Sequence, residues 1–239
     1  MSTVTDVEIP VRGGAMRAAL ALPDTTPAAG VVVLHEAFGL NDDIRGIAAR
    51  FADEGYVALA PDLYTPGIKA LCIAQAMLAL ARRRGAALDR AASARDWLAA
   101  RPDVDGDRIG AVGFCMGGGF ALLLGSAGGL RATSVNYGDV PKQVDQLRGV
   151  CPVVGSYGAD DKRLVPAARR LESFLTELGV PHDVKVYDGA GHSFLNRDHP
   201  AWADKTFGRM MPIAYDADAA EDAWRRILAF FADHLRGGS

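Results

Sequence analysis

The 239-residue chain has an ordinary globular composition, with 49% hydrophobic and 23% charged residues, and this length can bury a large apolar core without disulfides or metals. Its formal net charge is −3 and no run of basic residues occurs, which argues against a nucleic-acid partner because phosphate contacts need clustered Lys and Arg. The cysteines Cys72, Cys115 and Cys151 are widely spaced and odd in number, so neither a disulfide framework nor a CxxC metal site is expected.

The predicted elements begin with a hairpin and then alternate between strands and helices. Two short strands at residues 4–9 and 16–22 flank the turn Arg12-Gly13-Gly14, which is typical of an antiparallel hairpin at a sheet edge. The pattern then predicts strand 31–34, helix 44–54, strand 57–60, one or two helices over 68–100 broken near Gly85, strand 109–113, helix 116–126, strands 132–136 and 150–157, helix 164–178, strand 184–187 and helix 217–235.

This alternation predicts an α/β fold class. Strands that alternate with helices favour a mostly parallel, doubly wound sheet with helices on both faces, and the hairpin adds an antiparallel N-terminal edge. No repeat or polar linker divides the chain, so residues 1–239 are expected to form one domain. Sites in such sheets lie beyond the C-terminal ends of the strands, and the main candidate residues below directly follow predicted strands.

A cysteine occupies the corner between a predicted strand and a predicted helix. Residues 110–126 read GAVGFCMGGGFALLLGS, and Cys115 stands between Gly113 and Gly117 with the spacing of a nucleophile elbow, G-x-[nucleophile]-x-G. A helix N-terminus beneath the sulfur favours the thiolate. Free cysteines are commonly buried and inert, which is our expectation for Cys72 and Cys151. Cys115 is instead predicted to be a nucleophile.

A thiol nucleophile needs a base, and the base needs an orienting acid. Of the five histidines, His192 follows the last predicted strand in a glycine-rich loop, as the chain order nucleophile, acid, histidine requires. The acid of the triad should follow the strand at 150–157, which is the strand before the one that leads to His192. We choose Asp160, the first acid after Gly158; Asp161 is the alternative one residue away, and a capping or solvated role is expected for it.

The oxyanion formed on a carbonyl substrate needs two preorganised N–H donors. One is expected from Met116, directly after the nucleophile, and the other from Ala37 in the loop HEAFGLND that follows strand 31–34. Glu36 is an acid in this otherwise apolar loop.

Several stretches together resemble the dienelactone hydrolase family of the α/β-hydrolases. They read HEAFGLNDDIRGIAARFADEGYVALAPDLY, GFCMGGG, GADDKRLVP and GAGHSFLN, and the closing segment 218–235 is similar too. The resemblance covers nearly the whole chain. It implies an α/β-hydrolase fold without a cofactor, with Cys115, Asp160 and His192 as a triad and Ala37 and Met116 as oxyanion donors. It also implies that Glu36 holds the resting thiol and receives its proton when substrate binds; a solvated loop carboxylate is the plainer interpretation.

Sulfur narrows the expected substrates. A thiolate leaves a tetrahedral intermediate easily, because its parent thiol has a pKa of ~8.5, whereas the alkoxide of an ordinary ester leaves far less easily. The expected reaction is therefore hydrolysis of small lactones or activated esters through a thioester, which the resemblance connects with aromatic catabolism. A broad-specificity aryl or enol esterase with another natural substrate is the alternative.

Residues that would bind the substrate are harder to identify. Dienelactone carries a carboxylate that the best-known family members hold with arginines, but here Asn196 stands at the matching place after the histidine, followed by Arg197. The segment 193–215 is long and aromatic, as lids and binding loops often are, although ordinary packing would also explain it. The pocket candidates are Phe38, Tyr137, Trp202 and Arg197.

Other classes fit the sequence less well. A thiol redox or peroxide-sensing protein lacks a resolving CxxC partner, and a catalytically silent binding protein would not need the complete order of the triad. No metal site is expected, because His35, Glu36 and His192 lack a helical metal-binding spacing. The N-terminus has no secretory signal and no segment approaches the roughly 18 apolar residues that cross a membrane. We therefore expect a cytoplasmic monomer or weak homodimer without a membrane partner.

Overall fold

The computed structural model describes residues 2–65, 67–198 and 212–236. Its described strands form one eight-stranded sheet in the order β1-β2-β4-β3-β5-β6-β7-β8. The strands are β1 (Val4–Val11), β2 (Gly14–Ala21), β3 (Ala28–Leu34), β4 (Val57–Pro61), β5 (Val104–Phe114), β6 (Ala132–Asn136), β7 (Val153–Gly158) and β8 (His182–Tyr187). β1 and β2 pair antiparallel, β2 also pairs antiparallel with β4, and the remaining pairs are parallel. The predicted fold class, including the antiparallel edge, is confirmed.

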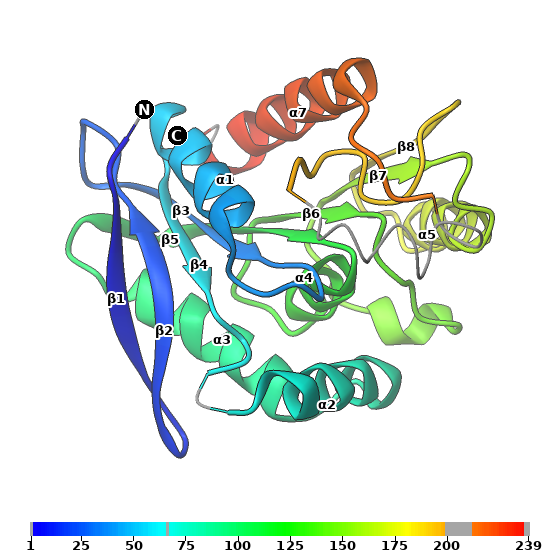
Figure 1. Cartoon of the computed structure of the whole chain (residues 1–239). Coiled ribbons are helices and arrows are strands. Elements are labelled where there is room, and N and C mark those ends of the chain that lie inside the picture. Colours follow the sequence, from blue (N-terminus) through cyan, green and yellow to red (C-terminus); the bar gives the residue numbers. More distant parts are fainter. Residues whose placement is uncertain (1, 66, 199–211, 237–239) are drawn as a thin grey trace.

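Helices cover both faces of this sheet (Figure 1). The α-helices are α1 (Asp42–Asp53), α2 (Lys69–Arg82), α3 (Ala86–Ala99), α4 (Met116–Ser126), α5 (Val165–Glu177) and α7 (Ala217–Phe231). A short 3-10 helix, η1 (Val144–Leu147), precedes β7, and one π-helical turn, η2 (Ala232–Arg236), follows α7. The break predicted near Gly85 is confirmed, because Arg83 and Gly85 between α2 and α3 both have a positive φ (53° and 136°).

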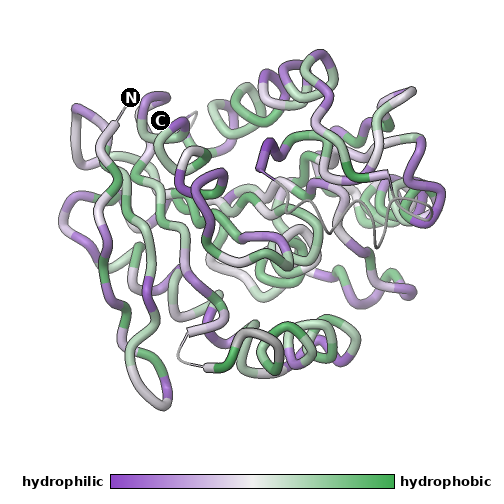
Figure 2. The backbone as a smooth tube through the Cα atoms, viewed as in Figure 1, coloured by the Kyte–Doolittle hydropathy of each residue, from purple (hydrophilic) through white to green (hydrophobic). Residues whose placement is uncertain are grey.

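The core strands are apolar on both faces because each face is covered. Along β3, Val31 and Val33 belong to one apolar cluster, whereas Val32 and Leu34 belong to the other, as the two-residue period of a strand requires. The first cluster includes α1 and α7, and the second includes α2 and α3. Figure 2 shows the central strands as mainly hydrophobic.

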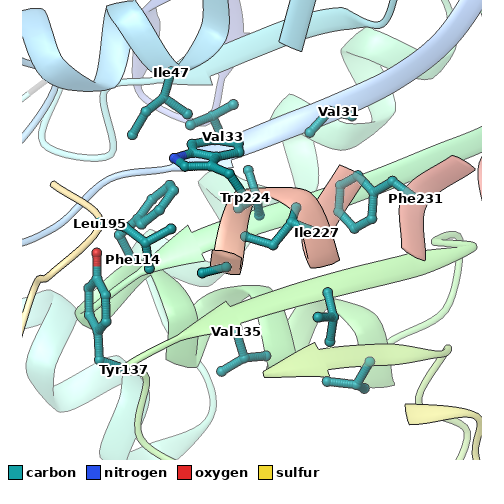
Figure 3. Close-up of a cluster of buried hydrophobic side chains, with 14 of the residues drawn as sticks. Val31, Val33, Ile47, Phe114, Val135, Tyr137, Leu195, Trp224, Ile227 and Phe231 are labelled. Atoms are coloured by element: carbon teal, nitrogen blue, oxygen red, sulfur yellow. The ribbon is translucent and has the colours of Figure 1, made fainter. Parts of the chain in front are cut away.

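Aromatic residues join α1 and α7 over the middle of the sheet. The ring of Phe51 in α1 lies 5.4 Å from that of Trp224 and 5.9 Å from that of Phe231, both in α7. Figure 3 shows Trp224, Ile227 and Phe231 of α7 beside the strands. This core fixes the sheet beneath the loops at the C-terminal ends of β3, β5, β6, β7 and β8, where the candidate site lies.

Candidate active site

Cys115 lies at a sharp corner between β5 and α4. Its backbone has φ 52° and ψ −115°, a conformation that residues with a side chain rarely adopt and that persists only where the surroundings enforce it. Here the Cys115 N–H donates to the Asn136 carbonyl (3.0 Å), and the Cys115 carbonyl accepts from Gly118 N–H (3.0 Å). The predicted strand–turn–helix geometry is therefore present, with the cysteine half-buried at its corner.

The two glycines of the elbow allow backbones to come very close. A Cβ atom at Gly113 would lie 2.0 Å from the Gly117 carbonyl oxygen, and one at Gly117 would lie 2.2 Å from the Leu34 carbonyl oxygen. Both distances are too short for any side chain. The start of α4 thus sits directly against the end of β3, which brings the loop after β3 beside Cys115.

His192 is held by Asp161 and not by Asp160, which corrects the sequence-based choice of acid. His192 Nδ1 lies 2.7 Å from Asp161 Oδ2, and both side chains are buried. Asp160 is half exposed and faces Lys162 at 3.7 Å. The Asp160 N–H is bound to the Ala190 carbonyl (3.0 Å), so the turn places the next residue against the imidazole.

The surroundings of His192 favour its protonated form. Burial acts to lower the pKa of His192, but its electrostatic and hydrogen-bond interactions with the Cys115 and Asp161 side chains outweigh burial and raise the pKa to about 10. Because Nδ1 is occupied by Asp161, the second nitrogen faces the reaction. The Cys115 side chain acts on His192 through both charge and a hydrogen bond, so Nε2 can exchange a proton with the thiol or with a bound substrate.

Glu36 is a buried carboxyl group beside the same histidine loop. It is 3% exposed, which contradicts the plainer interpretation of a solvated carboxylate. Its Oε1 accepts a hydrogen bond of 2.6 Å from Ser193 Oγ. Burial raises the pKa of Glu36 to about 7, although the Ser193 hydrogen bond and the His192 charge oppose the rise. At neutral pH Glu36 can therefore both carry and release a proton.

Ala37 and Met116 lie on either side of one tyrosine hydroxyl. Tyr64 Oη donates to the Ala37 carbonyl (3.1 Å) and lies 3.7 Å from Met116 Sδ. Within the described parts of the chain, neither Ala37 N–H nor Met116 N–H has an acceptor. The structure thus brings together the two residues predicted as oxyanion donors.

A buried polar link fixes the segment that follows His192. Tyr137 Oη donates to Asn196 Oδ1, and Asn196 Nδ2 donates to Asp43 Oδ2 at 2.6 Å. The Tyr137 ring lies 5.1 Å from the His192 ring, and Figure 3 shows Tyr137 beside Phe114 and Leu195.

Tyr137 was predicted near the site, whereas the contributions of Asp43, Asn196, Ser193 and Tyr64 were missed. Ser193 could have been considered from the sequence, because it directly follows His192.

The other pocket candidates fare differently. Arg197 is exposed, and its guanidinium donates to Tyr215 Oη (2.7 Å) and lies over the Tyr215 ring, so nothing in its contacts supports a substrate-binding role. Phe38 is half-buried in the loop after β3, and its pocket role stays a prediction. Trp202 lies outside the described residues.

Three findings concern the remaining thiols, groups that could hold a metal ion, and the length of the helices. Cys72 and Cys151 are buried and free, and burial raises the pKa of the Cys151 thiol to about 12, which fits an unreactive role. In the part of the chain that the structure describes, no group of three or more His, Cys, Asp or Glu side chains could hold a metal ion. No helix in the same part is long and apolar enough to span a membrane.

Comparisons with known proteins agree with this geometry. The dienelactone hydrolase family matches residues 16–235. The chain is 30% identical over 240 residues to the carboxymethylenebutenolidase of Rhodococcus opacus, which covers 90% of this chain and 85% of that protein. The crystal structure of a dienelactone hydrolase-like promiscuous phosphotriesterase from metagenomic libraries superposes with a TM-score of 0.83 and 28% identity, covering 98% of both chains. A dienelactone hydrolase structure from Anabaena variabilis has the same fold, with a TM-score of 0.72, 20% identity, and coverage of 98% of this chain and 99% of that one. The chain is a hydrolase and belongs to the dienelactone hydrolase family.

Proposed function

We propose that the chain hydrolyses small lactones and activated esters through a triad of Cys115, His192 and Asp161. The observation that carries this proposal is the combination of a strained cysteine elbow with a buried His192–Asp161 pair at 2.7 Å. A histidine oriented by a buried carboxylate is the arrangement that activates a nucleophile in hydrolases on unrelated folds.

In the first half of the reaction Cys115 becomes acylated. Glu36 takes the thiol proton, and Cys115 Sγ forms a bond to the carbonyl carbon while the carbonyl electron pair moves to oxygen. In this proposal the N–H groups of Ala37 and Met116 donate hydrogen bonds to the oxyanion. When the intermediate collapses, the carbon–oxygen bond to the alcohol breaks and the alkoxide takes the proton from the His192 imidazolium.

In the second half, water releases the acid. His192 takes a proton from a water molecule, whose oxygen attacks the thioester carbonyl, and the carbon–sulfur bond breaks to return the Cys115 thiolate. The thiolate then takes its proton back from Glu36. Asp161 holds the same imidazole nitrogen throughout and stabilises the imidazolium, which protonates the alkoxide and forms again from water.

Glu36 completes the proposal as a proton acceptor for the resting thiol. Its pKa of about 7 allows it to take up a proton when the thiolate is needed. A thiol kept neutral until substrate arrives is also oxidised less readily, because oxidation follows thiolate character.

The leaving-group argument sets the substrate class. The acyl-enzyme forms efficiently only if the alcohol leaves about as readily as the thiolate, so enol lactones and aryl esters are preferred over alkyl esters and peptides. The cytoplasmic location and the monomer or weak homodimer stay predictions from the sequence.

The test compares hydrolysis of p-nitrophenyl acetate and of dienelactone by wild type, Cys115→Ala, Cys115→Ser and His192→Ala. We expect the Cys115→Ala and His192→Ala variants to lose turnover, and wild type to keep it in a chelator. Turnover of aryl esters without turnover of dienelactone would keep the mechanism and remove that substrate. Full activity of Cys115→Ala would overturn the mechanism itself.

A further inference from the structure

We infer that His35 is a positioning residue that fixes the oxyanion hole by holding the peptide between Glu36 and Ala37. The inference rests on the proposed function, since it concerns the donor that Ala37 offers to an oxyanion at Cys115. It assigns a task to a fully buried histidine that takes no part in the triad.

The contacts of His35 determine which ring nitrogen carries the proton. The Leu63 N–H donates to His35 Nε2 at 3.1 Å, and a backbone amide can only donate, so Nε2 is unprotonated. The proton of the neutral ring is therefore on Nδ1, which lies 2.6 Å from the Glu36 carbonyl oxygen and donates to it. Because both nitrogens are occupied, His35 cannot act as a general base.

The Glu36 carbonyl and the Ala37 N–H belong to one planar peptide unit. In a trans peptide these groups point in opposite directions, so a hydrogen bond that fixes the carbonyl also fixes the direction of the N–H. The same carbonyl accepts a second hydrogen bond from Gly39 N–H (3.1 Å). Two donors on one carbonyl polarise the peptide and strengthen its N–H as a donor.

The next peptide is held as well, so the whole loop is fixed before substrate arrives. Tyr64 Oη donates to the Ala37 carbonyl (3.1 Å), and the Tyr64 ring lies edge-on to the His35 ring with 4.8 Å between centroids. Donors that need no reorganisation during the reaction are the ones that stabilise an oxyanion most. His35 supplies this preorganisation from the side of the loop away from the reaction.

The test measures two reactions of the same sulfur. Acylation of Cys115 by p-nitrophenyl acetate passes through an oxyanion, whereas alkylation by iodoacetamide displaces iodide and forms none. In His35→Phe, which keeps the ring shape and removes both nitrogens, we expect acylation to slow by ~10- to 100-fold, somewhat less than the loss of a whole oxyanion donor. Alkylation should change by less than about 2-fold, because no oxyanion forms in that reaction.

The matched variant is His35→Asn, whose side-chain N–H lies close to the position of Nδ1. We expect it to restore most of the acylation rate, because it can again donate to the Glu36 carbonyl. If His35 had only a structural role, the rates of both variants would fall in parallel with their thermal stability. Acylation and alkylation would then slow together.

Two results would overturn the inference. The first is an unchanged ratio of acylation to alkylation in His35→Phe, whether both rates stay as in wild type or both fall equally. The second needs no variant: NMR of ¹⁵N-labelled histidine should show His35 as the Nδ1–H tautomer, as the Leu63 N–H contact requires, and the opposite tautomer would contradict it. If wild type is alkylated but never acylated at Cys115, the proposed function itself has failed. If wild type is acylated and only the His35→Phe result disagrees, the His35 inference has failed and the proposed function stands.

Discussion

Replacing Asp161 by asparagine should slow hydrolysis severely while leaving the shape of the site intact. Asp161 is fully buried and its Oδ2 lies 2.7 Å from His192 Nδ1. The amide removes the charge that stabilises the imidazolium. If its NH2 group faces Nδ1, the ring proton also moves to Nε2, which can then no longer accept a proton from the attacking water.

The magnitude follows from the loss of one buried charge. Opposite charges about 4 Å apart at an effective dielectric constant of about 20 interact by about 4 kcal/mol. Each 1.36 kcal/mol corresponds to about a factor of ten in rate, so kcat should fall by about 10²- to 10³-fold. The same substitution in a serine triad costs about 10⁴-fold, and a smaller loss is expected here because a thiol depends less on its base.

The assay is release of p-nitrophenolate under single-turnover conditions, with thermal unfolding measured in parallel. Asp160→Asn is the control, since Asp160 is half exposed and its partner is Lys162; we expect its rate to stay within about 2-fold of wild type. The reasoning is refuted if Asp161→Asn keeps more than about a third of the wild-type rate, or if Asp160→Asn loses as much.

Three further predictions concern stability. Burial raises the pKa of Glu36 from 4.5 to about 7, so between these pH values the folded state binds a proton that the unfolded state has lost. The free energy of unfolding should therefore fall as pH rises through this range, by up to ~3 kcal/mol. Urea unfolding at about pH 5 and about pH 8 should show this fall in wild type and a smaller one in Glu36→Gln. Gly117→Ala should lower the free energy of unfolding by more than about 3 kcal/mol, because its Cβ would strike a carbonyl of β3. The control Gly46→Ala, in open space on α1, should raise it by about 0.5–1 kcal/mol. Equal midpoints of thermal unfolding in the two variants would contradict this. Tyr137→Phe leaves the buried Asn196 Oδ1 without its donor and should cost about 1–3 kcal/mol in urea unfolding; a wild-type midpoint would show that this link is not needed.

The elbow was predictable because its causes lie within a few residues. Gly113 and Gly117 flank Cys115 at the spacing that a tight strand-to-helix turn needs, and a Cβ atom at either glycine would strike a backbone carbonyl, so no other residue fits. The fold class was predictable for a similar reason, since the alternation of buried strands and helices is written along the chain.

The identity of the acid was not predictable to the residue. Asp160 and Asp161 are adjacent in a turn and point in different directions. The choice between them is made by the hydrogen bond from Asp160 N–H to the Ala190 carbonyl, which depends on how a distant loop passes the end of β7.

Contacts between distant segments could not be predicted from the sequence for the same reason. Ser193 reaches Glu36, and Asn196 reaches Asp43, across more than 150 positions of the chain. Both contacts arise because the segment after His192 passes the loop after β3 and the start of α1. Periodicity and spacing describe neighbours in sequence and give no information about such a crossing.

The central claim is that Cys115 carries the acyl group during turnover. Mixing the protein with p-nitrophenyl acetate, quenching with acid and analysing the intact protein and its peptides by mass spectrometry tests this directly. The account predicts one acetyl group per chain, located on the peptide that contains Cys115, formed with a burst of p-nitrophenolate and absent from Cys115→Ala. Turnover at the wild-type rate by Cys115→Ala, or an acetyl group found only at another residue, would contradict it.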